Sequence, residues 1–340
     1  MGKIHHSYHD AGGGMLSRSA DRHSCRICGN SAGNQNYTVR EMMFGTGDEF
    51  DYFQCSKCGC LQILEMPVDM SKYYPAGYYS FAETHGRMAN LKEKALFQRD
   101  RFAYSGRGIL GRIVFGFSPN PALIHVRDLG LPLDARVLDV GSGDGRNIRV
   151  LARCGYTCLT GIDPYLPGDV DFGPNLKVWK RSMEALQGEF DLVMLHHSLE
   201  HMSDQRLAFA SIARLLAPRG ISLIRVPTVS SYAWERYRIH WVGLDAPRHF
   251  FLHSIQSLRT LAGEVNLRIK SITWDSTPFQ FWTSDQYEKG IPLNSPDSLL
   301  MNPVKLVLRY GKIKEMGKRA AILNKEGRGD QIAMLLAKES

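Results

Sequence analysis

Residues 136–145 read Arg-Val-Leu-Asp-Val-Gly-Ser-Gly-Asp-Gly. The apolar residues of the first half predict a short buried strand, and the three glycines of the second half predict a tight turn into a helix at about residues 146–153. Glycines at such a turn let the backbone come close to a ligand beside a helix N-terminus. The spacing is GxGxG, whereas a dinucleotide-binding fingerprint needs its third glycine at position 146, which is Arg.

The following segment, residues 157–163, predicts a second strand that ends in an acidic residue. Asp163 follows Gly143 by 20 residues. A carboxylate at the end of this strand can accept hydrogen bonds from both hydroxyls of a ribose. The two segments together predict a nucleotide-type pocket.

The rest of the chain alternates between predicted strands and predicted helices. Helices are expected at residues 204–216 and, behind a Ser254 cap, up to about residue 263. Further strands are expected at residues 189–196, 220–226, 267–274 and 329–337. This alternation predicts a doubly wound sheet. The gap from 275 to 329 is too long for a plain loop and predicts a helical insertion before the last strand.

Two CxxC pairs stand near the N-terminus. They are Cys25 with Cys28 and Cys55 with Cys58, and a glycine directly follows each pair. Four thiolates in two matched turns predict a closed, structural zinc site. Cys60 is a spare that could replace Cys58 as a ligand. The remaining two cysteines, 154 and 158, are expected to be core or surface thiols.

VLDVGSGDG, then GID, then FDLVMLHHSLEHM resembles the class I S-adenosylmethionine (SAM)-dependent methyltransferases. The resemblance implies an α/β fold with a doubly wound, mostly parallel, seven-stranded Rossmann-like sheet. It also implies a set of cofactor contacts. These are Asp139, Gly141, Ser142 and Gly143 around the methionine half of SAM, Asp163 on its ribose, Ser182 and Met183 against its adenine, and His196 at the end of the fourth strand.

The N-terminal half is similar to one subgroup of that family. CxxCG twice, the Tyr-rich stretch 73–80, Pro247-Arg-His249 and residues 279–287 resemble methyltransferases with an N-terminal zinc motif, among them sugar C-methyltransferases and enzymes of polysaccharide-biosynthesis clusters. The similarity spans roughly residues 25–338. It implies a sugar, nucleotide-sugar or lipid-linked glycan as acceptor. Tyr74, Tyr78 and Tyr79 either cover SAM or the acceptor, or pack in the core.

Catalytic candidates follow the fourth predicted strand, in His-His-Ser-Leu-Glu-His at 196–201. A histidine suits proton removal because its pKa is close to working pH. In the sugar C-methyltransferases the Glu200–His201 pair is tied to catalysis, and His249 helps to close the site. A second interpretation makes His197, Glu200, His201 and His249 ligands of a divalent metal such as Mg²⁺, as in some O-methyltransferases of this fold. In a third, Glu200 and His201 only order the loop.

The chain carries 42 Lys+Arg against 34 Asp+Glu, a net charge of +8. Residues 131–300 are neutral overall, whereas residues 301–340 carry nine basic and four acidic side chains. Because the positive charge lies outside the predicted SAM-binding core, its distribution argues against a nucleic-acid methyltransferase. That activity is kept as an alternative function, together with a metal-assisted O-methyltransferase. The basic C-terminal segment is typical of a cap that contacts phosphate groups or an anionic membrane surface, or of a solvated helix face.

The N-terminus has no apolar core of a signal peptide, and the odd cysteine count fits a reducing, cytoplasmic setting. The oligomeric state is not predicted. The expected division of the chain is a disordered tail at 1–24, a zinc module at 25–60, a Tyr-rich and helical connector at 61–130, a SAM-binding core at 131–279, a basic helical cap at 280–328 and the final strand at 329–340.

Overall fold

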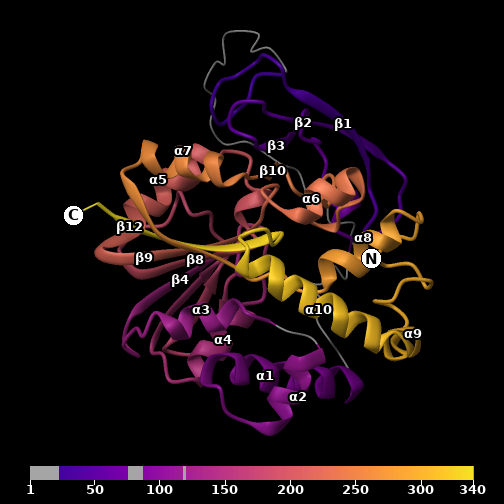
Figure 1. The fold of residues 1–340 in the computed structure, drawn as a ribbon. Coiled ribbons are helices and arrows are strands. Elements are labelled where there is room, and N and C mark those ends of the chain that lie inside the picture. The colour runs from indigo at the N-terminus through magenta and orange to yellow at the C-terminus, as the bar shows by residue number, and fades with distance from the viewer. Residues whose placement is uncertain (1–22, 76–86, 118–119, 340) are drawn as a thin grey trace, which may run out of the picture.

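The computed structural model describes residues 23–75, 87–117 and 120–339 (Figure 1). Nearly all of the predicted N-terminal tail, as well as Tyr78 and Tyr79, lie outside these residues. The described chain contains one large sheet and one small sheet.

The large sheet has the strand order β11-β12-β9-β8-β4-β5-β7-β6. The strands are β4 (Arg136–Val140), β5 (Cys158–Ile162), β6 (Val170–Asp171), β7 (Leu176–Trp179), β8 (Phe190–His196), β9 (Leu216–Pro227), β11 (Leu267–Trp274) and β12 (Gln331–Lys338). The five strands from β9 to β7 are parallel, and β12 lies antiparallel between β9 and β11. The mostly parallel Rossmann-like sheet is therefore confirmed.

The predicted count of seven strands is one short for the described residues. The additional strand, β6, has only two residues and pairs antiparallel with β7 at the edge of the sheet. Neither β6 nor the four-residue β7 is long enough for its pattern to be located in the sequence. The predicted boundaries of the other strands in this sheet agree with the observed ones within about two residues. The exception is β9, which begins at Leu216, directly after α5.

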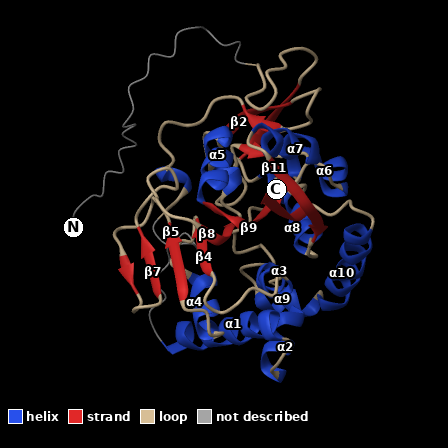
Figure 2. Ribbon diagram, turned by 90° about the vertical axis from the view of Figure 1, so that its left-hand side faces the viewer, coloured by secondary structure: helices blue, strands red, loops and turns tan. Residues whose placement is uncertain are grey.

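Helices cover both faces of the large sheet (Figure 2). One face carries α5 (Gln205–Leu215) and α7 (Ile255–Glu264), whose first turns are capped by Asp204 and Ser254. The other face carries α1 (Arg87–Ser105), α2 (Ile109–Phe117), α3 (Ala122–Asp128) and α4 (Arg146–Arg153). The carboxyl ends of the parallel strands meet at one edge, where ligands bind in sheets of this kind.

The small sheet has the order β1-β2-β3-β10 and is wholly antiparallel. Its strands are β1 (Gln35–Arg40), β2 (Glu49–Gln54), β3 (Leu61–Ile63) and β10 (Phe251–Leu252). The last of these comes from far along the chain, so the front end of the protein is built from more than residues 25–60. The loop just before β10 carries His249, which links the small sheet to the predicted site.

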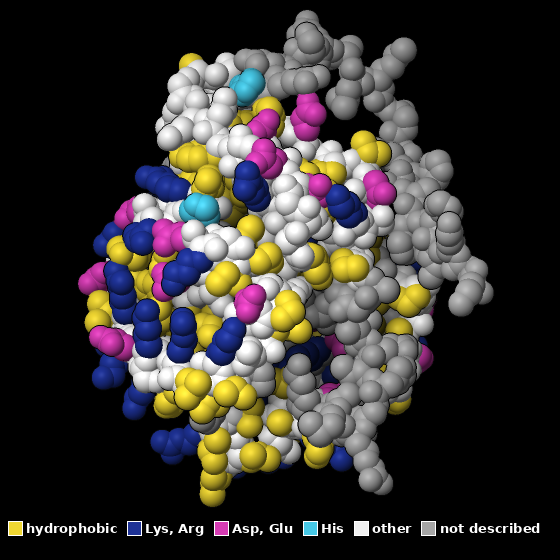
Figure 3. Space-filling model, turned by 90° about the vertical axis from the view of Figure 1, so that its right-hand side faces the viewer, with side chains coloured by type: hydrophobic (Ala, Val, Ile, Leu, Met, Phe, Trp, Pro, Cys, Tyr) yellow, Lys and Arg dark blue, Asp and Glu magenta, His cyan; other side chains and the backbone are white. Residues whose placement is uncertain are grey.

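Three helices fill the predicted insertion between β11 and β12: α8 (Phe279–Tyr287), α9 (Pro303–Leu308) and α10 (Tyr310–Lys325). A shorter helix, α6 (Tyr232–Tyr237), packs against α8. Lys and Arg side chains gather on the face that carries α10 (Figure 3). Among the described residues, no helix combines the length and the apolar character needed to cross a bilayer. The contact of this basic face with an anionic surface stays a prediction.

Arg248 joins the small sheet to the rest of the molecule. Its side chain is completely buried and donates to Glu41 Oε1 at 2.9 Å and to Asp245 Oδ1 at 2.6 Å. A third bond runs to the backbone carbonyl of Tyr73 at 3.2 Å. Glu41, also fully buried, accepts further bonds from the backbone N–H groups of the following turn, residues 43–46. Every carboxylate at this site is therefore paired, which a buried charge requires.

Replacing Glu41 by Ala should strongly destabilise the protein, because it leaves Arg248 buried with one carboxylate fewer. We expect a loss of about 3–5 kcal/mol in the free energy of unfolding, measured by urea denaturation. Glu49→Ala is the matched control, because Glu49 pairs with Arg40 on the surface, with half or more of each side chain exposed. Its loss should stay below about 1 kcal/mol. Equal losses in the two variants would contradict the role given to Glu41.

Candidate active site

The glycine-rich loop between β4 and α4 closes over the end of β5. The backbone N–H groups of Gly141 and Ser142 donate to the last carbonyl of β5, at 2.8 and 3.1 Å. Gly141 has φ of +69°, and a Cβ there would lie 2.5 Å from the Cβ of Ser198. The N–H of Gly143 donates to Asp163 Oδ2 at 3.1 Å. The loop and the predicted ribose carboxylate thus belong to one cradle.

Several buried polar atoms around this loop have no hydrogen-bond partner among the described residues. They are Asp139 Oδ2, Ser142 Oγ and both ring nitrogens of His196. Burial, and then the charge of Asp163, raises the pKa of Asp139 to about 8. A buried carboxylate without a partner is costly. A ligand that brings an ammonium group would relieve this cost, so the residues present fit the methionine half of SAM.

The two residues predicted for adenine follow β7. Ser182 is half-buried, whereas Met183 is 3% exposed and its side chain belongs to the core beneath α5. Their contact with adenine stays a prediction. Gly161 is a further residue of the cradle: a Cβ there would lie 2.7 Å from Ser142 Oγ. The Gly-Ile-Asp triplet at 161–163 could have indicated this residue in the sequence, because its glycine precedes the acidic residue at the strand end by two positions.

The turn after β8 lies against the glycine loop. Ser198 Oγ donates to the carbonyl of Val140 at 2.9 Å. A short 3-10 turn, Leu199–His201, follows. It brings Glu200 and His201 next to His249 from the loop before β10, and the ligand atoms of these three residues lie within 4.8 Å of one another. The structure thus brings together three of the four predicted catalytic residues from segments far apart in sequence.

Backbone carbonyls hold both histidine rings. His201 Nδ1 lies 2.8 Å from the carbonyl oxygen of Arg248, and His249 Nδ1 lies 2.8 Å from that of Gly243. Because a carbonyl can only accept, Nδ1 carries a proton in each ring. His249 Nε2 lies 3.9 Å from Glu200 Oε1, and the two ring centres are 4.7 Å apart. The two rings therefore lie together beside one carboxylate.

Burial and charge set the protonation states of this cluster. Burial, and then the charge of His249, lowers the pKa of His201 to about 4. Burial alone raises the pKa of Glu200, but the hydrogen bond from His197 and the charges of the neighbouring histidines outweigh it and lower that pKa to about 2. At neutral pH Glu200 is therefore ionised and His201 is a neutral base.

His197 has a different role from its neighbour. Arg225 Nη1 donates to His197 Nε2, so His197 carries its proton on Nδ1, which donates to Glu200 Oε1 at 3.2 Å. Its lone pair is thus engaged, and His197 positions Glu200. Behind it, Asp275 accepts from Arg225 Nε and from His125 Nε2. Sequence patterns did not single out this chain of residues, because no local spacing connects its members.

The donor set of Glu200, His201 and His249 can also bind a cation. Two imidazoles with one carboxylate suit a transition metal, whereas Mg²⁺ prefers oxygen ligands throughout. The predicted Mg²⁺ therefore finds no support in these residues. Tyr74 contributes its hydroxyl to the same corner, 3.3 Å from His201 Nδ1.

The predicted zinc ligands form a second cluster. The Sγ atoms of Cys25, Cys28, Cys55 and Cys58 all lie within 4.8 Å of one another, and two of their pairs are 3.5 Å apart. Tetrahedral zinc with four thiolates places its sulfur atoms about 3.8 Å apart. The four cysteines fit this geometry. Cys60 is fully buried outside the cluster, with Sγ near the carbonyl of Leu61.

Polar contacts connect the cysteine cluster to β3 and to α5. Gln62 Nε2 donates to Cys25 Sγ at 3.1 Å. Arg206 of α5 donates to the backbone carbonyls of Arg26 and Ile27, between the first two cysteines. The hydrogen bond with Cys58, against the opposing effect of burial, lowers the pKa of Cys25 to about 4. A thiolate is the form that binds a metal.

Comparison with known proteins identifies the central part of the chain. Residues 117–272 match the family described as a methyltransferase domain. This segment, less than half of the chain, is similar to a methyltransferase domain. It holds the glycine loop, Asp163, Glu200, His201 and His249, so the cradle and the histidine cluster lie within it.

The similar curated proteins are the human and mouse proteins named EEF1A lysine methyltransferase 2. They are 34% and 32% identical to the chain over 83 residues, which is 24% of this chain. These 83 residues cover 35% and 34% of the two relatives, so the chain spans about a third of their length.

Two of the similar solved structures are also methyltransferases. A putative sarcosine dimethylglycine methyltransferase from Galdieria sulphuraria is 18% identical, with a TM-score of 0.43, and the match covers 71% of this chain and 98% of that one. The 1,6-didemethyltoxoflavin-N1-methyltransferase of Burkholderia thailandensis, solved with S-adenosylhomocysteine, is 17% identical with a TM-score of 0.38, and the match covers 76% and 94%.

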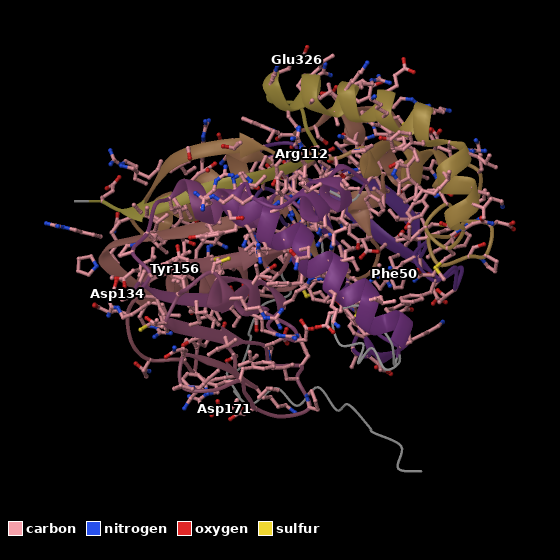
Figure 4. The ribbon with its side chains drawn as sticks, turned by 90° about the horizontal axis from the view of Figure 1, so that it is seen from below. Phe50, Arg112, Asp134, Tyr156, Asp171 and Glu326 are labelled. Carbon is pink, nitrogen blue, oxygen red and sulfur yellow. The ribbon has the colours of Figure 1, made fainter. Side chains whose placement is uncertain are left out.

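Asp163→Asn should weaken binding of S-adenosylhomocysteine, the product form of SAM. The variant keeps the size of the side chain but loses the charge that is predicted to accept the ribose hydroxyls, so we expect a fall in affinity of about 10- to 100-fold by calorimetry. Asp171→Asn is the control, because Asp171 lies at the far edge of the sheet (Figure 4). Its affinity should match the wild type. An unchanged affinity in Asp163→Asn would contradict the assigned ribose contact.

The purified protein should carry one zinc ion per chain, measured by elemental analysis. Cys28→Ser should lose most of this zinc and melt at a lower temperature, because three thiolates and one hydroxyl bind zinc less tightly. Cys154→Ser is the control, since Cys154 lies at the end of α4, outside the cluster. Full zinc content in Cys28→Ser, or a wild type free of zinc, would refute the site.

Proposed function

We propose that the protein transfers the methyl group of SAM to a hydroxyl or an acidic carbon of a sugar, nucleotide-sugar or glycan acceptor. The arrangement that carries this proposal is the neutral imidazole of His201, next to His249, beside the ionised Glu200 and against the glycine loop. Such a pair can remove a proton within reach of the cofactor.

SAM supplies a methyl group on a sulfonium and needs no activation, so the protein has to align the acceptor and take up its proton. His201 Nε2 is the proposed base. Its Nδ1–H donates to the carbonyl of Arg248, which fixes the ring orientation. Glu200 stabilises the imidazolium that forms once His201 takes the proton. His249 lies beside Glu200 and assists His201 through this carboxylate.

The zinc has a structural part in this proposal. Its four thiolates leave no open position for a substrate. It secures the small sheet. The loop before β10 of this sheet carries His249 and the Arg248 carbonyl that holds His201. We therefore expect metal loss to affect stability first and turnover as a consequence.

A second acceptor class follows from the similar curated proteins, whose names state lysine methylation. An amine acceptor also has to lose a proton, so the same histidines would serve. A panel of nucleotide sugars, sugar phosphates and lysine peptides, with release of S-adenosylhomocysteine as readout, separates the two classes. Turnover of peptides alone would reject the sugar acceptor.

His201→Ala should lower kcat by about 100- to 10,000-fold, because the general base is removed. Affinity for S-adenosylhomocysteine should stay within about twofold, since His201 lies outside the glycine loop. His240→Ala is the control, because His240 lies in a separate short turn after α6. Turnover that survives in His201→Ala would move the base to His249.

The pH profile gives the second readout for the same base. A base must be unprotonated, and the folded-state pKa of His201 is about 4. The rate therefore rises as pH rises through about 4 and is level near neutrality. A rise centred near pH 6.5, the ordinary value for His, would contradict the buried base.

A further inference from the structure

An apolar stripe lies on the outside of α9. Val304, Val307 and Leu308 are 68%, 71% and 81% exposed. They stand three and four positions apart, so they share one face of the helix. Leu300 and Met301, which come just before the helix, are also at least half exposed. A helix of a folded protein normally turns such a face toward the core, and an exposed apolar patch marks a binding surface.

The start of α9 is fixed without covering this stripe. Asn302 caps the helix, because its side chain accepts from the backbone N–H of Lys305 at 3.0 Å. Pro303 stands in the first turn, where its missing N–H costs nothing. All residues from Val304 to Leu308 are exposed. The stripe is therefore presented on the surface of the described chain.

Basic side chains continue from the stripe along α10. Residues 301–325 carry seven Lys and Arg side chains and one acidic side chain, Glu315. No carboxylate of the described residues lies within ion-pair distance of Arg309, Lys312 or Lys314. On the face that carries α10, Lys and Arg side chains gather beside apolar ones (Figure 3). An apolar stripe and a cationic surface thus adjoin each other.

This combination fits the surface of a membrane that contains anionic lipids. Apolar side chains can enter the boundary between headgroups and acyl chains, while Lys and Arg reach the lipid phosphates. A protein partner fits less well, because five of the seven basic side chains are Lys, which is depleted in protein–protein interfaces. A nucleic acid would use the charge but leave the stripe uncovered.

We propose that α9 and the start of α10 dock the protein on an anionic membrane surface, with the stripe inserted between the lipid headgroups. The proposal goes beyond the proposed function, because docking needs neither SAM nor an acceptor. Docking brings the protein to the surface that holds lipid-linked glycans, and this consequence alone rests on the proposed function.

The test is co-sedimentation of the full chain with vesicles of phosphatidylcholine and phosphatidylglycerol in equal parts, compared with vesicles of phosphatidylcholine alone. We expect the protein to bind the mixed vesicles and to leave them as salt rises, because salt screens the attraction. Lys312→Gln should weaken this binding about fivefold. Arg219→Gln is the matched control and should bind as the wild type does. Arg219 lies near the start of β9, where β12 ends, on the opposite side of the molecule from α9 (Figure 1).

A second variant tests the stripe without changing the charge. Leu308→Gln should weaken binding to the mixed vesicles by about tenfold, since one large apolar side chain no longer enters the lipid. Leu133→Gln is the matched control. Leu133 is 50% exposed and directly precedes Asp134, which lies on the side of the molecule opposite α9 (Figure 4).

Three results would overturn the proposal. The first is a wild type that binds neither kind of vesicle, or both equally. The second is wild-type binding by Leu308→Gln, which would remove the stripe from the contact. The third is a wild-type dimer in analytical ultracentrifugation that Leu308→Gln converts to a monomer, because a second copy of the chain would then cover the stripe. Vesicle binding is measured without SAM, so failure of methyl transfer would reject the proposed function and leave the docking surface in place.

Discussion

The buried guanidinium of Arg248 is the interaction on which the rest of the structure depends. It is fully enclosed and donates to Glu41, directly after β1 of the small sheet, and to Asp245 of its own loop. A buried charge is tolerated only when it is fully paired. The N-terminal third of the chain and the loop before β10 therefore have to be in place together. The ion pair specifies how the two sheets meet.

The same loop supplies the polar frame of the active site. The carbonyls of Gly243 and Arg248 hold the Nδ1 atoms of His249 and His201, and Tyr52 of β2 donates to the carbonyl of His249. The orientation of the two histidine rings thus depends on the docking of the small sheet. The cysteine cluster, the buried ion pair and the histidine pair form one connected series of contacts from the front end of the protein to the glycine loop.

Local patterns predicted the central sheet well. The glycine loop, Asp163 at the end of β5, the cap at Ser254 and both CxxC turns depend on neighbours within a few residues, which a sequence displays directly. The short edge strands and β10 were not predicted, because two to four residues show no period. The pairings of Arg225 with Asp275 and of Glu41 with Arg248 join residues 50 and 207 positions apart. Only the folded chain reveals these partners, and with them the positioning role of His197.

The place of β12 in the large sheet affects the order in which the protein can form. This strand, Gln331–Lys338, lies between β9 and β11. Neither β9 nor β11 has its antiparallel partner until this strand has formed. During synthesis the cysteine turns emerge first, whereas the sheet stays open until residues 331–338 have left the ribosome. Gln331, the first residue of that strand, also contacts Arg225. The hydrogen bonds that place His197 beside Glu200 are therefore completed last, after the cysteine turns have formed.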